Sequence, residues 1–225
     1  MIREEERPVE AAARSQKRGP YQRSHERRER IALAVLELVD EFGHEGVTTA
    51  LVAARSDSRE PTVLYHFPTK EHLLVAALDR VDELEADLSG ISDGKAALDL
   101  ESLREVANAS VTAHDRRLRL FVMLRGQAAT SGHPAAEYFA SRTERALTVW
   151  TGMITRSQRE GLAHPGLDPR ETARQVLALW DGLVLAHFSD QSFDCGQALV
   201  DGIRRLTGRN WVEALAEFNR PDHGL

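Results

Sequence analysis

The sequence contains very little cysteine and few aromatic residues. Cys195 is the only cysteine among 225 residues, and aromatic residues make up 6% of the chain. A single cysteine excludes an internal disulfide and a metal site built from several thiolates, and it is typical of a reducing compartment, so we expect a cytoplasmic protein. With no identified histidine partner, Cys195 is most simply interpreted as a small buried side chain.

Long apolar segments are also missing. The first ten residues, MIREEERPVE, lack the apolar region of a signal peptide. No stretch reaches the roughly 18–20 consecutive apolar residues that span a bilayer, so we expect no membrane association. A chain of this length buries roughly 70–75% of its unfolded surface, which suffices for one substantial domain or for a small domain joined to a larger one.

Motifs of enzymes and metal sites are absent as well. The sequence has no H-E-x-x-H, no G-x-S-x-G and no P-loop glycine pattern. The nine histidines and 35 acidic residues keep a helical enzyme as an alternative. We nevertheless predict no catalytic residue, no cofactor and no metal, because four early histidines lack a recognisable metal-ligand spacing, namely His25, His44, His66 and His72.

The net charge of −6 is unevenly distributed. Residues 1–70 hold 12 basic and 12 acidic side chains, whereas residues 71–225 hold 17 basic and 23 acidic ones, so the negative excess belongs to the second part. The first 30 residues carry nine basic side chains against six acidic ones. This balance permits binding to nucleic acid through a local basic patch but does not require it.

The chain begins with a polar segment and then becomes helical in pattern. Residues 1–24 are charged, contain Pro8 and Pro20 and show no apolar period, so we expect a flexible, partly basic arm. From His25 an amphipathic helix is predicted to run to Gly43, because apolar residues recur at spacings of three and four. Those residues are Ile31, Ala34, Val35, Leu38, Val39 and Phe42.

A helix-turn-helix is predicted over residues 47–74. Thr48 is a plausible N-cap for a short helix, since its hydroxyl can accept one of the backbone N–H groups that a helix start leaves unpaired. Asp57 tolerates the left-handed backbone of a tight turn, and Pro61 fits the first turn of the next helix. Residues 62–66 are the predicted reading face. Three neighbouring side chains are predicted to be core: Val52, Val63 and Phe67.

No alternating strand pattern follows, and the remainder is predicted to be all-α. An apolar stripe between Leu73 and Leu88 is expected to support the small helix-turn-helix unit, which is too short for much stability of its own. The predicted division is a three-helix unit over residues 25–69 and a larger helical domain over residues 70–225. After the stripe, helices are predicted at residues 99–114, 116–131, 134–160, 169–189, 193–207 and 211–218.

Across about residues 28–78 the chain resembles the TetR family of bacterial transcriptional regulators. RERIALAVLELVDEFGHEGVTT is similar to the family's first helix, and EPTVLYHFPTKEHLL is similar to its recognition helix with the start of the fourth helix. DPRETARQVLALWDGLVLAHF is similar to its first dimer helix. The resemblance implies a repressor whose larger domain binds an effector and forms a homodimer. The matching residues are Phe42, Gly43, Gly46, Thr48, Ala53, Pro61, Thr62, His66, Phe67 and Lys70.

Three places depart from the family pattern. Asp57 and Ser58 stand where a glycine and an apolar residue are usual, which removes a core contact and predicts a looser turn. Leu64 occupies the usual place of a tyrosine that contacts phosphate, so that role is not assigned to it. Leu51 replaces a common polar residue, which indicates altered packing.

The second helix of a helix-turn-helix lies in the major groove, where its first residues meet base edges. Arginine can bond guanine at two atoms, glutamate can accept from cytosine and a threonine methyl can touch thymine, which assigns base contacts to Arg59, Glu60 and Thr62. Tyr65 and His66 are next in reach. A solvated Arg59 and a His66 that only packs on the first helix are the open alternatives. Phosphate contacts, expected at helix ends, are assigned to Thr48, Thr49, Tyr65 and Lys70.

Basic residues near the N-terminus are candidates for an adjacent minor groove, because arginine is attracted by the negative potential of narrow A-tracts. A tail that only adds solubility is the alternative. The residues concerned are Arg14, Lys17, Arg18, Arg23, Arg27 and Arg28.

Two recognition helices must lie about 34 Å apart to read two half-sites, so we expect a homodimer on a palindromic double-stranded DNA operator. Two late helices show the spacing of a helix-packing face. That face belongs either to the dimer interface, which the resemblance favours, or to the core of the protomer. Its residues are Leu177, Trp180, Val184, His187, Leu199, Ile203 and Leu206.

A small-molecule effector needs a concave site with a few polar groups. Large apolar side chains of the second domain are candidates for its wall, with ordinary core as the alternative for each. They are Phe121, Met123, Phe139, Trp150, Met153 and Trp180, with His114, Arg125 and Gln127 as polar partners. An architectural or cell-division factor on the same fold, which binds many chromosomal sites and ignores effectors, is the main alternative function.

Overall fold

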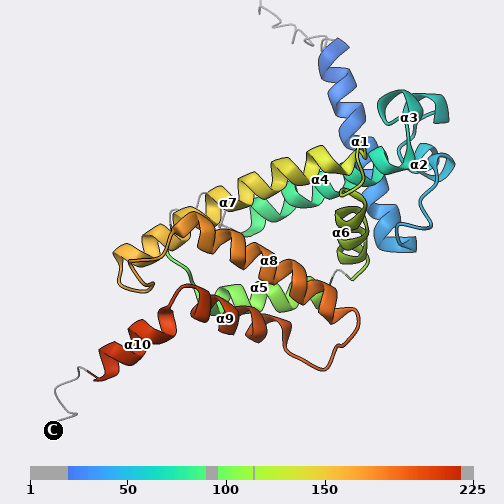
Figure 1. The fold of residues 1–225 in the computed structure, drawn as a ribbon. Helices are drawn as coiled ribbons and strands as arrows, with labels where there is room; N and C mark the ends of the chain where they lie inside the picture. Colours follow the sequence, from blue (N-terminus) through green and yellow to red (C-terminus); the bar gives the residue numbers. More distant parts are fainter. Residues whose placement is uncertain (1–19, 90–95, 114, 219–225) are drawn as a thin grey trace, which may run out of the picture.

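The computed structural model describes residues 20–89, 96–113 and 115–218, and all regular structure within these ranges is helical. This confirms the predicted all-α class for the described part of the chain. Figure 1 shows the arrangement of the helices. They are α1 (Pro20–Phe42), α2 (Thr49–Arg55), α3 (Glu60–His66), α4 (Lys70–Ser89), α5 (Leu100–Ala113), α6 (Asp115–Gln127), α7 (Ala135–Arg159), α8 (Pro169–His187), α9 (Cys195–Leu206) and α10 (Arg209–Phe218).

The first helix begins earlier than the sequence predicts. Helix α1 starts at Pro20 and not at His25, so Arg23, Arg27 and Arg28 lie on a helix and not in an arm. A proline is tolerated in a first helical turn because its missing N–H has no partner to lose there. The other three predicted arm residues, Arg14, Lys17 and Arg18, lie outside the described residues.

The predicted apolar face of α1 is buried, with one exception. Val35 and Leu38 are fully buried among the helices that surround them, but Phe42 is 51% exposed. Phe42 is the last residue of α1, and the chain turns away at Gly43, which has a left-handed φ of 75°. The prediction of Phe42 as a buried member of this face is therefore wrong.

One hydrophobic core joins the helix-turn-helix to the helices that follow it. Leu73 and Leu78 of α4 pack in the same cluster as Val52 of α2, Leu124 of α6 and Phe139 of α7. The expected support of the small N-terminal unit by α4 is confirmed. The cluster crosses the predicted domain boundary at residue 70, so the unit shares its core with the rest of the molecule.

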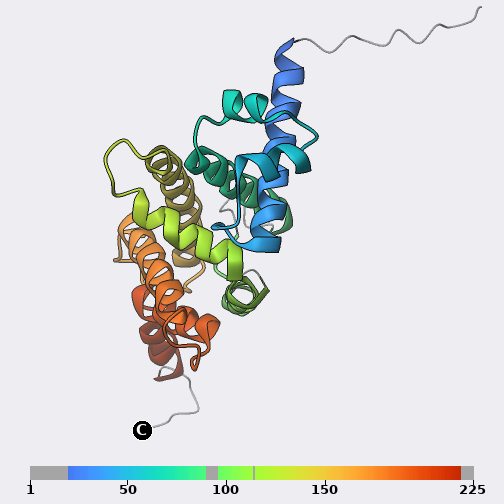
Figure 2. The same ribbon diagram turned by 90° about the vertical axis from the view of Figure 1, so that its right-hand side faces the viewer.

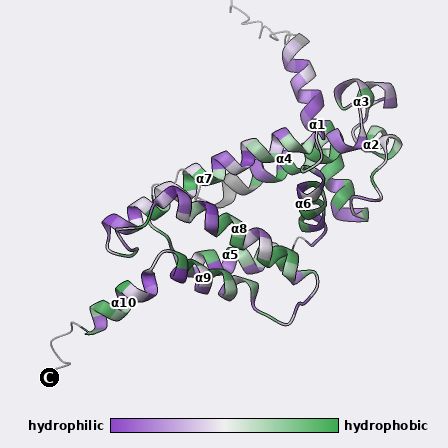
Figure 3. Cartoon of the chain, in the orientation of Figure 1, coloured by the Kyte–Doolittle hydropathy of each residue, from purple (hydrophilic) through white to green (hydrophobic). Residues whose placement is uncertain are grey.

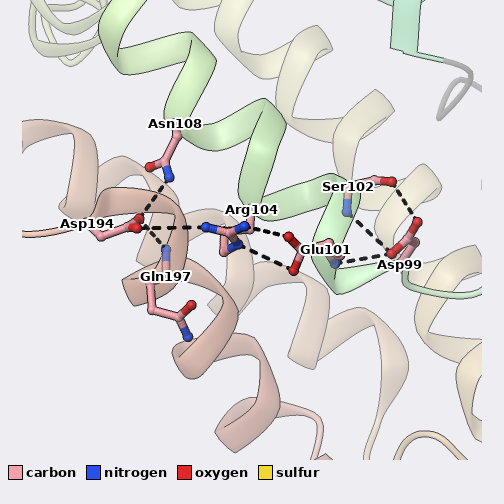
Figure 4. A network of polar contacts seen from close by, with 7 residues as sticks. All are labelled: Asp99, Glu101, Ser102, Arg104, Asn108, Asp194 and Gln197. Carbon is pink, nitrogen blue, oxygen red and sulfur yellow. Dashed lines mark hydrogen bonds and ion pairs between the residues drawn. The ribbon is translucent and has the colours of Figure 1, made fainter.

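A second core lies between α5, α7, α8 and α9, which pack side by side. Helices α5 and α9 approach very closely at Gly196, whose backbone N–H donates to Asn108 Oδ1 at 2.7 Å. Figure 4 shows the neighbouring polar network, in which Asn108 Nδ2 and the backbone N–H of Gln197 both donate to Asp194. Cys195 is buried as predicted, and burial raises the pKa of its thiol.

Helix α10 extends away from the rest of the molecule in Figure 1, and Figure 3 shows apolar residues along it. Trp211, Leu215 and Phe218 are exposed at successive helical turns. None of the helices in the described residues is long and apolar enough to cross a membrane.

Candidate DNA-binding surface

The turn between α2 and α3 is closed by backbone hydrogen bonds. The Thr48 hydroxyl accepts from the backbone N–H of Leu51 at 3.3 Å, which confirms the predicted N-cap. Asp57 has a left-handed φ of 49°, as predicted, and the backbone N–H of Ser58 donates to the carbonyl of Ala53 at 2.9 Å. A bond of this span satisfies a carbonyl that the end of α2 leaves unpaired. The turn thus has a regular backbone closure, and its looseness relative to other members of the family stays a prediction.

Helix α3 presents one face to the core and the other to solvent. Val63 and Phe67 are buried as predicted, whereas Leu64 and Tyr65 are 41% and 81% exposed. Pro61 lies in the first turn of α3, as predicted. Figure 2 shows α3 at the outer edge of the molecule, so its exposed face can meet a large ligand without any movement of the fold.

Several predicted DNA contacts already have partners within the protein. The Thr49 hydroxyl donates to Glu60 Oε1, so the starts of α2 and α3 are tied together by two residues assigned separately from sequence. Lys70 Nζ donates to the backbone carbonyl of Glu45 at 3.0 Å, and Thr48 is occupied as a cap. These bonds fix the positions of the side chains, but all three helix starts remain at the surface.

Of the other assigned residues, Arg59 is exposed at the N-terminal boundary of α3, and its side chain makes no capping bond. Thr62 is partly exposed in the first turn of that helix. Leu51 is 43% exposed on α2, and the altered packing predicted at this position stays a prediction. Leu51 on α2 and Leu64 on α3 are thus exposed apolar side chains of the helix-turn-helix.

The C-terminal end of α3 is held by α1. Arg28 Nη1 donates to the backbone carbonyl of His66 at 2.9 Å, and its guanidinium lies 4.5 Å from the centre of the Phe67 ring. His66 is partly buried beside Tyr65, and burial followed by the charges of Arg28 and Arg27 lowers the pKa of its imidazole. Sequence reasoning missed the role of Arg28, because no local pattern connects residues 38 positions apart.

The helix-turn-helix is also bonded to the second part of the chain. Arg117 of α6 makes two bonds to the Asp40 carboxylate, at 2.7 and 2.6 Å. Arg116 donates to the carbonyl of Asp40 at 2.6 Å and to that of Glu41. These bonds satisfy carbonyls that the C-terminal end of α1 leaves unpaired. The start of α6 is therefore bonded directly to the end of α1.

The predicted effector residues do not form one site. Phe121 and Trp180 line a cavity of about 80 Å³ between α4 and the helices after it. Arg125 and Phe139 line a larger groove of about 410 Å³. Phe139 and Met153 are buried core residues, which was the alternative for each. Neither hollow is lined by Met123, Gln127, Trp150 or Met153, and His114 lies outside the described residues.

Three of the predicted interface residues belong to the protomer. Val184, Leu199 and Ile203 are buried in the core, because the faces of α8 and α9 that carry them pack within one chain. They cannot meet a second copy in this fold, and their assignment to the interface is wrong. The remaining predicted residues, Leu177, Trp180, His187 and Leu206, are partly exposed.

No group of three or more histidine, cysteine, aspartate or glutamate side chains among the described residues is arranged to hold a metal ion. The features that remain are an exposed helix-turn-helix and a larger helical part bonded to it. Together they define the architecture of a helix-turn-helix DNA-binding protein with an attached helical domain.

Residues 32–77 match the profile of a family described as "Bacterial regulatory proteins, tetR family". The HTH-type transcriptional repressor KstR of Rhodococcus jostii (strain RHA1) is 47% identical over 55 residues, which are 24% of this chain and 26% of KstR. The matched segment thus spans about a quarter of the length of that repressor. The helix-turn-helix of this chain therefore has the sequence pattern of that family over residues 32–77.

Similarity of fold extends over most of the chain. A TetR transcription regulator from Haloarcula marismortui superimposes with a TM-score of 0.64 and 19% identity, over 82% of this chain and 97% of that one. The multidrug binding protein EbrR, complexed with imidazole, has a TM-score of 0.60 and 26% identity over 82% of this chain and 93% of its own. Most of the chain therefore has the fold seen in TetR-family regulators.

Proposed function

We propose that this protein is a sequence-specific transcriptional repressor that binds operator DNA and leaves it when a small-molecule effector binds. The exposed face of α3 carries the proposal, since Tyr65 is 81% exposed on a helix-turn-helix of the TetR family. The 47% identity to a named repressor over this segment supports the same function. A DNA-binding role would place the protein in the bacterial cytoplasm.

The proposed base contacts are Arg59, Thr62 and Tyr65, with Leu64 available to a thymine methyl. Glu60 accepts from the Thr49 hydroxyl, so we propose that it sets the angle between α2 and α3 before it meets any base. Phosphates would meet the backbone N–H groups and side chains at the starts of α2 and α4, including Thr48, Thr49 and Lys70. His66 lies at the end of α3, where we expect it to lie near a phosphate of the bound DNA.

We propose that the protein is a homodimer through the outward face of α8 and not through the buried residues named above. Ala178, Gly182, Leu185 and Ala186 are exposed at successive turns of this helix, and Leu185 is 59% exposed. Small residues let two helices approach closely. A two-fold axis beside α8 would place two copies of α3 on one palindromic operator.

Purified protein should recover short genomic fragments that share one palindromic sequence, at both 50 and 200 mM salt. The Tyr65→Ala and Arg59→Ala variants should lose this enrichment, while Val106→Ala, an exposed change on α5, should keep it. Scattered and strongly salt-sensitive binding would instead support an architectural DNA-binding protein. Absence of DNA binding at both salt concentrations would reject the proposed function.

A further inference from the structure

An open groove of about 410 Å³ lies where the end of α6 meets α7 and the start of α8. Its volume falls within the range of about 300–1,000 Å³ that is usual for small-molecule sites. The groove is lined by side chains of two kinds. One kind is polar and includes three arginines, and the other is small or apolar. The apolar residues are Ala128, Ala129, Ala136, Phe139, Ala140 and Leu147.

The basic groups of the groove are three arginines, and each is paired with a carboxylate: Arg125 with Asp181, Arg170 with Glu144 and Arg174 with Glu171. The residues that line the groove include three arginines, Arg125, Arg170 and Arg174, and one acidic residue, Glu144. This is unusual for its surroundings, because residues 71–225 hold 23 acidic side chains against 17 basic ones. Because three carboxylates balance the three arginines, the groove favours an anion through the unused N–H donors of its guanidinium groups and not through net charge.

The arginines are held in place without using all their donors. Arg170 Nη2 binds both oxygens of Glu144, at 2.8 and 2.9 Å. Arg125 donates to Thr143 at 3.3 Å and to Asp181 at 3.2 Å. Each guanidinium has five N–H groups in a rigid plane that matches a carboxylate or phosphate, so donors remain for a ligand. Fixed donors lose little freedom when an anion binds.

The remaining wall suits an apolar body. The alanines leave space where larger side chains would fill the groove, and the Phe139 ring lies under Arg125, 5.1 Å from its guanidinium carbon. An inorganic ion alone would leave this apolar surface in water. A ligand that covers it gains about 25 cal/mol for each Å² of apolar surface removed from water.

We infer that the groove binds a small amphipathic anion, with a carboxylate or phosphate on the arginines and a compact apolar body on the alanine wall. This inference rests on the proposed function only in making that anion the effector. Helix α6 connects the two sites, because Arg125 lies near its end and Arg116 and Arg117 at its start bind α1. A ligand that draws Arg125 into the groove pulls on the helix-turn-helix through α6.

The test is calorimetric titration of the full chain, without DNA, with octanoate and with phenyl phosphate. Their neutral counterparts octanamide and phenol serve as ligand controls. We expect both anions to bind and the neutral compounds to bind at least about tenfold more weakly, since a hydrogen bond to a charged group is worth roughly that factor or more. Binding of one anion only would identify the headgroup. Equal binding of neutral compounds, or no binding of either anion at 10 mM, would overturn the inference.

The Arg174→Gln and Arg125→Gln variants should each reduce anion affinity about tenfold. Arg205→Gln, an exposed change on α9, is the matched control and should change nothing. Circular dichroism confirms that each variant is folded, and equal affinity in all four proteins would also overturn the site. Operator release is measured separately. If the anion binds but the operator DNA is not released, the groove is an anion site but the anion is not the effector. If the protein does not bind DNA at all, only the proposed function is rejected.

Discussion

Gly196 of α9 lies against the backbone of Arg104 on α5. A Cβ atom at residue 196 would be 2.3 Å from the Arg104 carbonyl oxygen, a distance that no real contact allows. The two helices can approach this closely only because residue 196 is a glycine. The same approach brings the backbone N–H of Gly196 to the amide oxygen of Asn108.

Gly196→Ala should therefore destabilise the protein. The clash is with backbone, which cannot rotate away, so α5 and α9 must separate at a cost of about 1–3 kcal/mol in the free energy of unfolding. Gly202→Ala is the matched control, because its Cβ would meet the flexible end of Leu179. Urea unfolding measures both variants, and equal losses would contradict the special role of the α5–α9 contact.

Thr48→Ala should destabilise α2 through loss of its N-cap. The hydroxyl accepts from the backbone N–H of Leu51, and removal of such a cap costs about 1 kcal/mol. Thr48→Ser keeps the oxygen and should retain most of the stability. Thermal unfolding compares the two variants, and identical midpoints would show that the cap contributes nothing.

Operator affinity should increase as the pH falls through the range in which His66 titrates. Burial and two nearby arginines lower the pKa of the His66 imidazole in the protein without DNA, which favours its neutral form. DNA phosphates near His66 would favour its charged form and so raise the pKa of its imidazole in the complex. Because the complex then binds the proton more tightly than the free protein does, DNA affinity increases as the pH falls below the pKa of the complex. The free protein shows the opposite trend, because a lowered folded pKa reduces stability as the pH falls.

Fluorescence anisotropy at pH 7.5 and pH 6.0 measures this effect. His66→Gln should bind equally at both values, whereas His164→Gln, which lies against Trp211 far from α3, should keep the dependence of the wild type. A dependence that survives in His66→Gln would show that another group carries the proton.

Leu185→Glu should separate the proposed dimer. It places a charge at the centre of the exposed apolar face of α8, where a second copy would bury it without a partner. Val106→Glu makes the same change at an exposed position of α5 and is the control. Sedimentation velocity reports the mass of each variant, and a Leu185→Glu protein that remains dimeric would place the interface elsewhere.

The helices and their local signals were predictable because they depend on neighbours in sequence. The Thr48 cap, the left-handed Asp57 and the buried Phe67 all follow from side chains within a few positions of one another. The residues that resemble the TetR family lie in the segment that its profile matches, residues 32–77. The sequence could not show which apolar helix faces pack against each other, because the apolar faces of different helices carry similar residues.

Ile203 and Leu185 illustrate that limit. Both occupy apolar positions on late helices, yet Ile203 is fully buried and Leu185 is 59% exposed. Helical spacing gives the face of a residue but not the partner of that face. The groove could not be predicted from the sequence for the same reason. Arg125 and Arg174 come together only because α6 and α8 both pack against α7.

Arg117→Ala should reduce the response to an effector more than it reduces stability. Its pair with Asp40 is partly exposed, and such pairs contribute roughly 0.2–1 kcal/mol, so the fold should remain intact. Coupling between two sites is typically worth only about 1–3 kcal/mol, and loss of one link between α6 and α1 is a large share of that.

The variant should therefore bind operator within about fivefold of the wild type, since a change of less than 1 kcal/mol corresponds to at most roughly that factor. It should need a higher octanoate concentration for release, at an octanoate affinity that is unchanged without DNA. Arg119→Ala on the same helix removes an ion pair within α6 and a contact with the Phe188 ring at 4.6 Å, but it leaves the Asp40 contacts in place, which makes it the control. If both variants release operator as the wild type does, the signal does not pass through the start of α6, and the shared core of α4 with α1 becomes the remaining route.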